Sequence, residues 1–138
     1  MQQDAWILPG LLAQAGDRPL RWVLLHHACP GRGDHFDWMF EPLQADAPLP
    51  SARVPDEPAS IAIGGRLQLE PAPDHRRDYL NAPTAPRDLS GGRGTVRRIA
   101  SGSWCSDGRL LTLRRDEGGD QTWLTLPSAA QLTLERIA

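Results

Sequence analysis

The sequence predicts an all-β fold, a small closed or partly open β-barrel with short turns and an irregular N-terminal arm. Strand-like apolar runs recur along most of the chain, and clusters of Gly, Pro, Asp and Ser separate them. Glycine and proline contribute 13 residues each to a chain of 138, which is typical of a turn-rich β protein. A chain of this length fits one domain with a modest buried core.

An arm is expected over residues 1–20, followed by a single domain over residues 21–138. The segment Ala5-Trp-Ile-Leu-Pro-Gly10 is too short, and too broken by Pro and Gly, for a helix or a central strand. We therefore expect this segment to pack on the outside of the domain through Trp6 and Leu8. The expected strands cover residues 21–27, 35–41, 59–70, 94–101, 109–115, 121–126 and 131–137.

Turn signals lie between the expected strands. Residues 42–58 are rich in Pro, Ala and Asp and have little periodicity, which predicts a surface loop. Residues 106–108 and 117–120 carry hairpin-turn chemistry, because glycine accepts positive φ. The run Gly91-Gly-Arg-Gly94 could cradle an anion with its N–H groups, but a tight turn into the next strand is favoured, and Arg93 could still point into a site.

The charged residues exclude several kinds of chemistry. The net charge of −2 provides no global basic field for non-specific duplex binding, so any nucleic-acid contact should be local, at an end. All 15 cationic residues are arginine. Without lysine the chain has no lysyl-adenylate, Schiff base or P-loop lysine, so it cannot itself be a ligase. Arginine suits phosphate because its planar fork binds two oxygens, although an ordinary arginine-rich surface is the alternative for most of them.

The cysteines and the N-terminus bound the cellular context. Cys29 and Cys105 are far apart, so a disulfide stays open but no disulfide framework is implied. A zinc-type Cys/His site at Cys29 competes with the favoured alternative, a free thiol. The N-terminus lacks a secretion-signal pattern, and no apolar run approaches the ~20 residues that span a bilayer. We expect a cytoplasmic monomer with no membrane contact.

The segment from His35 to Glu41 has the strongest functional pattern. Polar and aromatic residues alternate, so His35 and Asp37 share one face of a strand while the aromatic side chains face a core. An imidazole and a carboxylate on one rigid strand suit a divalent ion such as Mn²⁺, and His27 offers a further ligand after an apolar run. A polar, solvent-facing strand without a metal is the alternative.

Six short segments occur in one order: Trp22-Val-Leu-Leu-His-His27, His35-Phe-Asp-Trp-Met-Phe-Glu41, Arg66-Leu-Gln-Leu69, Asp74-His-Arg-Arg-Asp-Tyr79, Gly94-Thr-Val96 and Ser101-Gly-Ser-Trp104. Together they resemble the 3′-phosphoesterase domain of bacterial DNA ligase D, a Mn-dependent repair module that trims 3′ ends. The resemblance runs from about residue 21 to the C-terminus. It is closer still to the short, free-standing relatives of that domain, which resemble this chain in having Met where the ligase-linked domain has Arg.

The resemblance implies a Mn²⁺-dependent phosphoesterase acting on nucleic-acid 3′ ends in DNA repair, with Zn²⁺ or Co²⁺ as other possible ions. The implied partners are nucleic-acid 3′ ends or a phosphorylated small molecule, together with DNA-repair proteins. The implied site residues are the metal ligands His27, His35 and Asp37 and the catalytic residues Arg66, His75 and Tyr79.

Each implied catalytic residue has a physical role and a structural alternative. Arg66 would hold phosphate oxygens, or it pairs with a carboxylate. His75 would protonate the leaving oxygen or bind phosphate, or it belongs to a charged turn. Tyr79 would hydrogen-bond the same group, or its ring belongs to the core. His26 is the alternative to His27 as a ligand: alignment along the apolar run selects His27, and alignment on Ala28 selects His26.

Departures from the family pattern bear on catalysis. Met39 stands where the ligase-linked domain has a phosphate-binding Arg, and residues 1–20 show no counterpart of that domain's N-terminal arm. Two further hypotheses therefore stay open: a non-catalytic metal module that binds phosphorylated ends or a repair partner, and a phosphoesterase for a small metabolite. Whether Arg32, Arg93 or Arg97 reaches the pocket in place of the missing guanidinium discriminates between the enzyme and the binding module.

Overall fold

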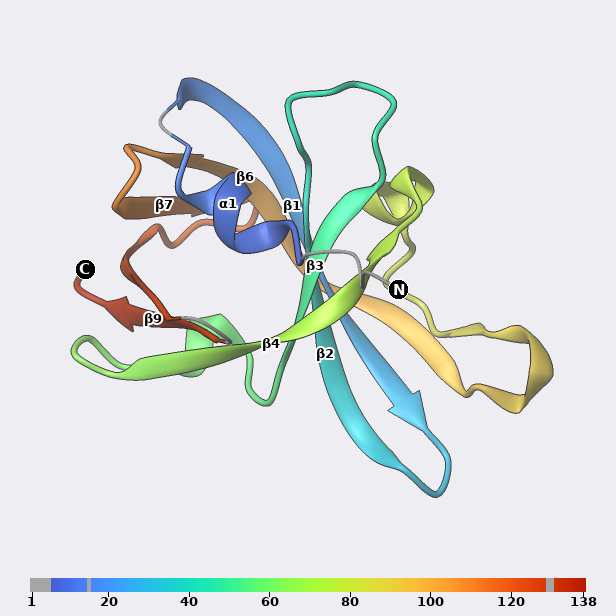
Figure 1. Cartoon of the computed structure of the whole chain (residues 1–138). Coiled ribbons are helices and arrows are strands. Elements are labelled where there is room, and N and C mark those ends of the chain that lie inside the picture. The colour runs from blue at the N-terminus through green and yellow to red at the C-terminus, as the bar shows by residue number, and fades with distance from the viewer. Residues whose placement is uncertain (1–5, 15, 129–130) are drawn as a thin grey trace.

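The computed structural model describes residues 6–14, 16–128 and 131–138 (Figure 1). Most of this part of the chain is β-strand, with one short α-helix and three 3-10 turns. The elements in order are α1 (Leu8–Leu12), β1 (Gly16–Cys29), β2 (Gly33–Phe40), β3 (Leu49–Val54), η1 (Pro58–Ser60), β4 (Arg66–His75), η2 (Arg77–Asn81), β5 (Arg87–Asp88), η3 (Ser90–Gly92), β6 (Thr95–Ser106), β7 (Leu110–Arg115), β8 (Gln121–Pro127) and β9 (Leu132–Arg136).

The strands form one antiparallel sheet that closes into a barrel. Their order is β1-β2-β3-β4-β9-β8-β7-β6, and pairing of β6 with β1 closes the ring, while β5 is an extra strand on β6. The prediction of a small, almost all-β barrel is thus confirmed. The β1–β2 hairpin and the chain leading into β6 extend side by side beyond the barrel body (Figure 1).

Aromatic side chains fill the barrel interior. Trp38 and Phe40 are fully buried, as the alternation in β2 predicted. The Trp38 ring meets Trp22 edge-on at 6.3 Å between centroids, and Phe40 meets Trp104 at 5.8 Å. Burying a large apolar side chain stabilises a fold by about 1.5–3 kcal/mol, so these rings are a main source of stability.

Gly102 lets the interior close around Trp22. The Trp22 Nε1–H donates to the carbonyl oxygens of Ser103, at 3.0 Å, and Arg114, at 3.2 Å. A Cβ atom at position 102 would lie 1.7 Å from the Arg114 oxygen and 2.9 Å from the Trp22 nitrogen. The glycine of the Ser-Gly-Ser-Trp segment is therefore required by packing.

The N-terminal arm is more integrated than predicted. Strand β1 begins at Gly16 rather than near residue 21, and α1 is a helix, although we expected none. We expected the arm to pack on the outside of the domain through Trp6 and Leu8; Leu8 does make such a contact, but it reaches the interior cluster, where it is fully buried. The Trp6 Nε1–H donates to the carbonyl of Ser51 at 2.8 Å, which fastens the arm to β3. Residues 1–5 of the predicted arm lie outside the described residues.

Strand β3 was wrongly predicted as part of a surface loop over residues 42–58. It is buried on both faces except at the exposed Arg53, because Leu49 and Ser51 face an outer cluster while Ala52 and Val54 face the interior. A strand buried on both faces lacks the alternation that identifies half-buried strands. The strand predicted over 59–70 also shifts, and begins at Arg66.

A second cluster lies on the outer face of β1, β2 and β3. Alternation turns the odd-numbered residues outward there, and η2 with the residues after it covers them. The members of this outer cluster are Val23, Leu25, Met39, Leu49, Leu80 and Ala82, with Tyr79 packed against them. Polar side chains take over on the same face toward the tip of the β1–β2 hairpin.

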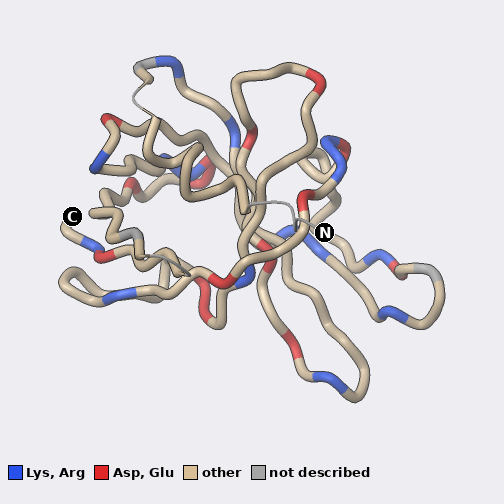
Figure 2. Tube along the Cα trace, viewed as in Figure 1, with Lys and Arg blue, Asp and Glu red and all other residues tan. Residues whose placement is uncertain are grey.

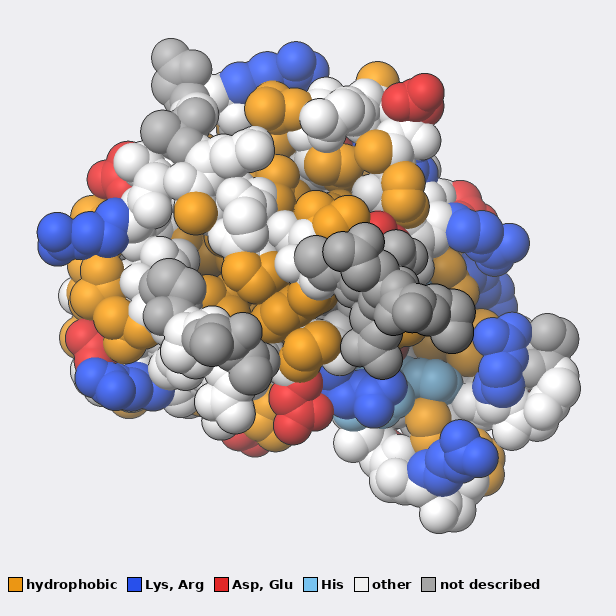
Figure 3. All heavy atoms as spheres, viewed as in Figure 1, with side chains coloured by type: hydrophobic (Ala, Val, Ile, Leu, Met, Phe, Trp, Pro, Cys, Tyr) orange, Lys and Arg blue, Asp and Glu red, His pale blue; other side chains and the backbone are white. Residues whose placement is uncertain are grey.

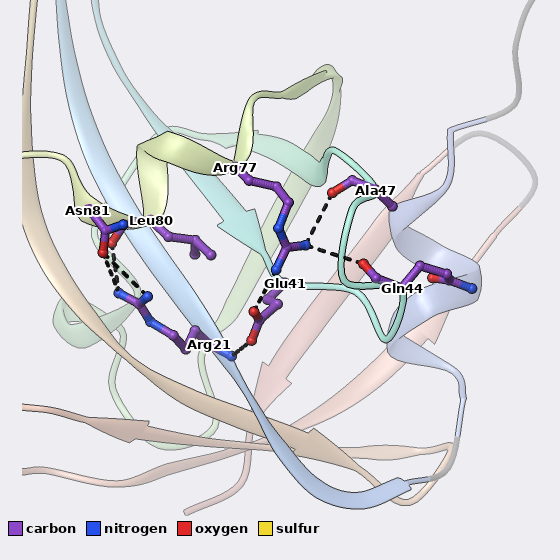
Figure 4. A network of polar contacts seen from close by, with 7 residues as sticks. All are labelled: Arg21, Glu41, Gln44, Ala47, Arg77, Leu80 and Asn81. Carbon is purple, nitrogen blue, oxygen red and sulfur yellow. Dashed lines mark hydrogen bonds and ion pairs between the residues drawn. The ribbon is translucent and has the colours of Figure 1, made fainter.

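A polar network holds η2 over the outer cluster (Figure 4). Arg77 donates from Nη2 to Glu41 Oε2 at 2.8 Å and from Nη1 to the carbonyls of Gln44 and Ala47. Glu41 Oε1 accepts from the Arg21 backbone N–H at 3.0 Å, and the Arg21 guanidinium donates to the Leu80 carbonyl at 2.9 Å. Glu41 therefore links the end of β2 both to β1 and to η2.

Basic and acidic residues are interspersed along most of the described chain (Figure 2). This agrees with the small net charge, so an electrostatic field that attracts a charged ligand must come from a local cluster of charged residues. Among the described residues, no helix has the length and apolar character needed to cross a membrane.

Candidate metal centre

Three candidate ligands converge on the outer face of the β1–β2 hairpin. His27 and His35 are directly paired across the two strands, and Asp37 follows on the same face. The His27 Nδ1 atom lies 3.2 Å from His35 Nε2 and 3.8 Å from Asp37 Oδ2, and His35 Nε2 lies 3.3 Å from Asp37 Oδ1. Both histidine side chains are largely buried. Asp37 is buried, and a buried carboxylate usually has a partner.

These distances fit a shared divalent ion. Two nitrogen or oxygen ligands of one first-row ion, each about 2.0–2.2 Å from it in tetrahedral or octahedral geometry, lie about 2.8–3.6 Å apart. The separations of 3.2 and 3.3 Å lie in this range and that of 3.8 Å lies slightly above it, with His27 nearest to Oδ2 of Asp37 and His35 nearest to Oδ1. Two imidazoles and one carboxylate are also a donor set that Mn²⁺, Zn²⁺ and Co²⁺ accept.

The other ring nitrogen of His27 fixes its tautomer. His27 Nε2 lies 2.8 Å from the carbonyl oxygen of Arg93, so it is assigned as the N–H donor. Nδ1 then presents its lone pair to His35 and Asp37. Metal-binding histidines typically donate their second N–H to a carbonyl or carboxylate, which orients the ring.

Gly94 brings that carbonyl to His27. Its φ is +94°, and a Cβ atom there would lie 1.8 Å from the carbonyl oxygen of Ala28 in β1. Only glycine allows this approach, so the glycine-rich run acts at least as a tight turn against β1, as predicted.

Cys29 offers a second ligand set. Nitrogen and sulfur atoms of His27, Cys29 and His35 all lie within 4.8 Å of one another, so these three residues could hold a metal ion. Both cysteines are free thiols. The Cys29 Sγ atom lies 3.3 Å from His27 Nε2, the nitrogen already bonded to Arg93, whereas Asp37 faces Nδ1. We favour the set with Asp37, because it leaves the bond to Arg93 intact.

The electrostatics favour the neutral form of His35. Burial lowers the pKa of His35 below its ordinary value of 6.5, because desolvation disfavours the imidazolium form. The charges of Arg53 and His27 lower the pKa further, and the Asp37 carboxylate opposes them. A neutral imidazole is the form that binds metal.

A cavity of about 500 Å³ opens beside the two histidines. Figure 3 shows histidine side chains at the surface next to basic ones, all arginine in this chain. Arg32 and Arg93, two of the three arginines proposed to replace the missing guanidinium, line this cavity; Arg97 is not among its lining residues. The lining consists of His27, Cys29, Pro30, Arg32, His35, Arg53, Gly91, Gly92 and Arg93.

Arg53 is a site residue that the sequence analysis missed. It is the residue of β3 directly paired with Asp37, and its side chain lines the cavity. Because residues 42–58 were predicted to be a loop, the direction of its side chain had no basis for prediction. The alternation of Ser51 and Arg53 was the available signal, but Pro50 and the small residues around it obscured it.

His75 and Tyr79 lie next to one another near the cluster. Their rings meet edge-on at 5.5 Å between centroids, and His75 Nδ1 is 2.9 Å from the Ser51 hydroxyl. Burial lowers the pKa of His75, while the charge of Asp37 raises it and that of His27 lowers it, which places His75 within the field of the candidate ligands. Tyr79 also packs on the outer cluster.

The structure does not bring Arg66 to the cluster. Its Nε atom pairs with Glu135 Oε1 at 3.0 Å at the start of β4, with the side chain 64% exposed. His75 ends the same strand, and nine residues of extended chain span about 30 Å. The ion pair with a carboxylate, the structural alternative for Arg66, is what the structure contains.

The sheet geometry also places His26 and Met39. His26 lies on the opposite face from His27, packs on Phe36 and pairs with Asp34 at 3.2 Å. His27, not His26, is therefore the histidine beside His35. Met39 is 1% exposed within the outer cluster, so this position is covered and apolar.

Compared with known proteins, the sequence matches no family model, and no curated protein matches it.

Proposed function

We propose that this chain is a metal-dependent phosphoesterase-like domain acting on the 3′ ends of nucleic acid, in DNA repair. One observation carries the proposal: His27, His35 and Asp37 present a nitrogen, a nitrogen and a carboxylate within 3.2–3.8 Å of one another, beside a cavity with three arginines in its lining. Such a site suits an anionic substrate, and the resemblance of the motifs supplies the reaction class.

His27, His35 and Asp37 would hold a divalent ion, with Mn²⁺ as the implied metal. When bound, the ion supplies Lewis acidity toward a phosphoryl oxygen and lowers the pKa of a coordinated water. The side chains have complementary tasks: the Arg93 carbonyl orients the His27 ring, and the arginines lower the cost of gathering negative charge.

His75 would deliver the proton that the leaving oxygen needs. The Ser51 hydroxyl donates to the Leu49 carbonyl at 2.8 Å, so its oxygen accepts from His75 Nδ1–H at 2.9 Å. This assigns the lone pair of neutral His75 to Nε2. Because burial lowers the pKa of His75, its neutral form is favoured; Nε2 would take a proton from the attacking water and then pass that proton to the leaving oxygen. Tyr79, edge-on to His75, would hydrogen-bond the same phosphate group.

The test is release of phosphate or nucleoside from 3′-phosphate and 3′-ribonucleotide primer ends, with and without Mn²⁺. The native chain should turn over only with metal, and His35→Ala should abolish turnover. His26→Ala is the matched control, because His26 lies on the opposite face of the same hairpin, and it should retain turnover. Metal-independent turnover, or equal loss in both variants, would contradict the proposal.

Met39 favours a second candidate, a non-catalytic metal module that binds phosphorylated ends. A buried methionine at the position of the family's phosphate-binding arginine removes one source of transition-state stabilisation without affecting the three ligands. This candidate predicts Mn²⁺-dependent binding of a 3′-phosphorylated oligonucleotide with no product formed. Preference for a small phosphorylated molecule over the oligonucleotide would indicate the metabolite phosphoesterase instead.

A further inference from the structure

The outer face of β3 places one guanidinium beside the candidate metal ligands. Arg53 is paired with Asp37 across β2 and β3, and directly opposed residues have Cα atoms about 4.5–5.5 Å apart. Asp37 is in turn paired with Leu25, two residues along the strands from the pair of His27 and His35 and on the same face. Arg53 thus stands beside the ligand cluster on a rigid strand, whereas Arg32 and Arg93 belong to turns.

The Arg53 side chain is available to a ligand. It is exposed and lines the cavity together with His27 and His35. Within the described part of the chain, it forms no ion pair with a carboxylate, although Asp37 is its cross-strand neighbour, because Asp37 faces the two histidines. Its charge already acts on the His35 ring.

We propose that Arg53 is the phosphate-binding residue of this site and takes the place of the guanidinium that Met39 lacks. The ligand class is a phosphate monoester or diester with one oxygen toward His27, His35 and Asp37 and others toward the Arg53 fork. A planar guanidinium binds two phosphate oxygens at once, which neither Met39 nor a lysine could do. The inference deepens the proposed function and rests on it for the metal site.

The test measures binding rather than turnover. Inorganic phosphate is titrated into the Mn²⁺-loaded full chain by calorimetry, for the native protein, Arg53→Met and Arg53→Lys. Arg114→Met is the matched control, because Arg114 is also an exposed strand arginine, in β7, but it lies 3.9 Å from Asp120 and is not among the residues that line the cavity. Mn²⁺ affinity of each variant is measured separately by electron paramagnetic resonance, and circular dichroism verifies folding.

Arg53→Met should weaken phosphate binding by about 10–100-fold, the usual effect of removing hydrogen bonds to a charged group. Arg53→Lys should fall between it and the native protein, because charge remains without the fork. Mn²⁺ affinity should not fall in any variant, and Arg114→Met should bind phosphate like the native chain.

Three outcomes would overturn the inference: no phosphate binding by the native loaded protein, native-like binding by Arg53→Met, or joint loss of phosphate and Mn²⁺ in that variant. The inference and the proposed function fail separately. Phosphate binding that depends on Arg53, with no hydrolysis of 3′ ends, would retain the inference and remove the enzyme. Hydrolysis of 3′ ends together with phosphate binding that does not depend on Arg53 would retain the enzyme and remove the inference.

Discussion

Replacing Glu41 with alanine tests how η2 is held over the outer face of the barrel. The carboxylate accepts from Arg77 at 2.8 Å and from the Arg21 backbone N–H at 3.0 Å, with the Glu41 and Arg77 side chains 20% and 28% exposed. A hydrogen bond to a charged group contributes about 1.5–3 kcal/mol when buried, and partial exposure reduces this. We therefore expect Glu41→Ala to lower the free energy of unfolding by about 2–3 kcal/mol.

Thermal and denaturant unfolding measure this effect. At about 3–5 °C per kcal/mol for a domain of this size, the midpoint should fall by about 6–15 °C. Asp78→Ala is the control, since its pair with Arg76 is 3.6 Å long, with side chains 62% and 77% exposed, and such pairs contribute about 0–1 kcal/mol. Hydrogen exchange should also speed up in η2 of Glu41→Ala. A shift no larger than that of the control would refute the role of this network.

Other predictions concern the glycine turn, the thiol and a hairpin cap. Gly94→Ala should lower the free energy of unfolding by about 2 kcal/mol or more, and it should weaken metal binding because the Arg93 carbonyl must move. Gly31→Ala is the control, since Gly31 also has positive φ but a Cβ atom there would have no neighbour within 4 Å, and its melting midpoint should fall less. Cys29→Ser should reduce Mn²⁺ affinity by less than about tenfold, because removing even a group that only orients a metal ligand costs roughly that much. The Co²⁺-loaded native chain should show no thiolate charge-transfer band. A larger loss of affinity would indicate that Cys29, rather than Asp37, is the third ligand. Hydrogen bonds from the backbone N–H groups of Leu110 and Arg109 lower the pKa of Asp107. Its ionised form therefore stabilises the fold fully at a pH above the ordinary pKa of 3.8. This stabilisation is lost as the pH falls through the lower pKa of the folded state. Melting of Asp107→Asn should therefore lie below the native midpoint at neutral pH and approach it in acid; a pH-independent difference would contradict this.

Residues whose placement depends on strand alternation could be predicted from the sequence. Period-2 alternation in β2 placed His35 and Asp37 on one face and Trp38 on the other, because only one register buries the aromatic rings. Alternation could not reveal β3, where both faces are buried, and so Arg53 stayed hidden. The role of Arg66 depended on a match of motifs, which carries no information about which end of β4 lies near the hairpin.

The N-terminal segment illustrates a second limit. Local sequence around Leu8 contains Pro and Gly, which argue against a long helix, and α1 is indeed only five residues long. Its stability comes from burying Leu8 and Leu12 in the barrel interior, a tertiary effect that propensity does not contain. The bond between His27 and Arg93 is likewise tertiary, since 66 residues separate them.

The most direct test of the metal centre is Mn²⁺ titration of the native chain, Asp37→Asn and Asp34→Asn. Both aspartates lie on β2, but Asp37 faces His27 and His35, whereas Asp34 faces away and pairs with His26. We predict one bound ion in the native chain and in Asp34→Asn, and loss of that ion in Asp37→Asn. Native-like binding by Asp37→Asn, or loss in Asp34→Asn, would contradict the assignment of the three ligands.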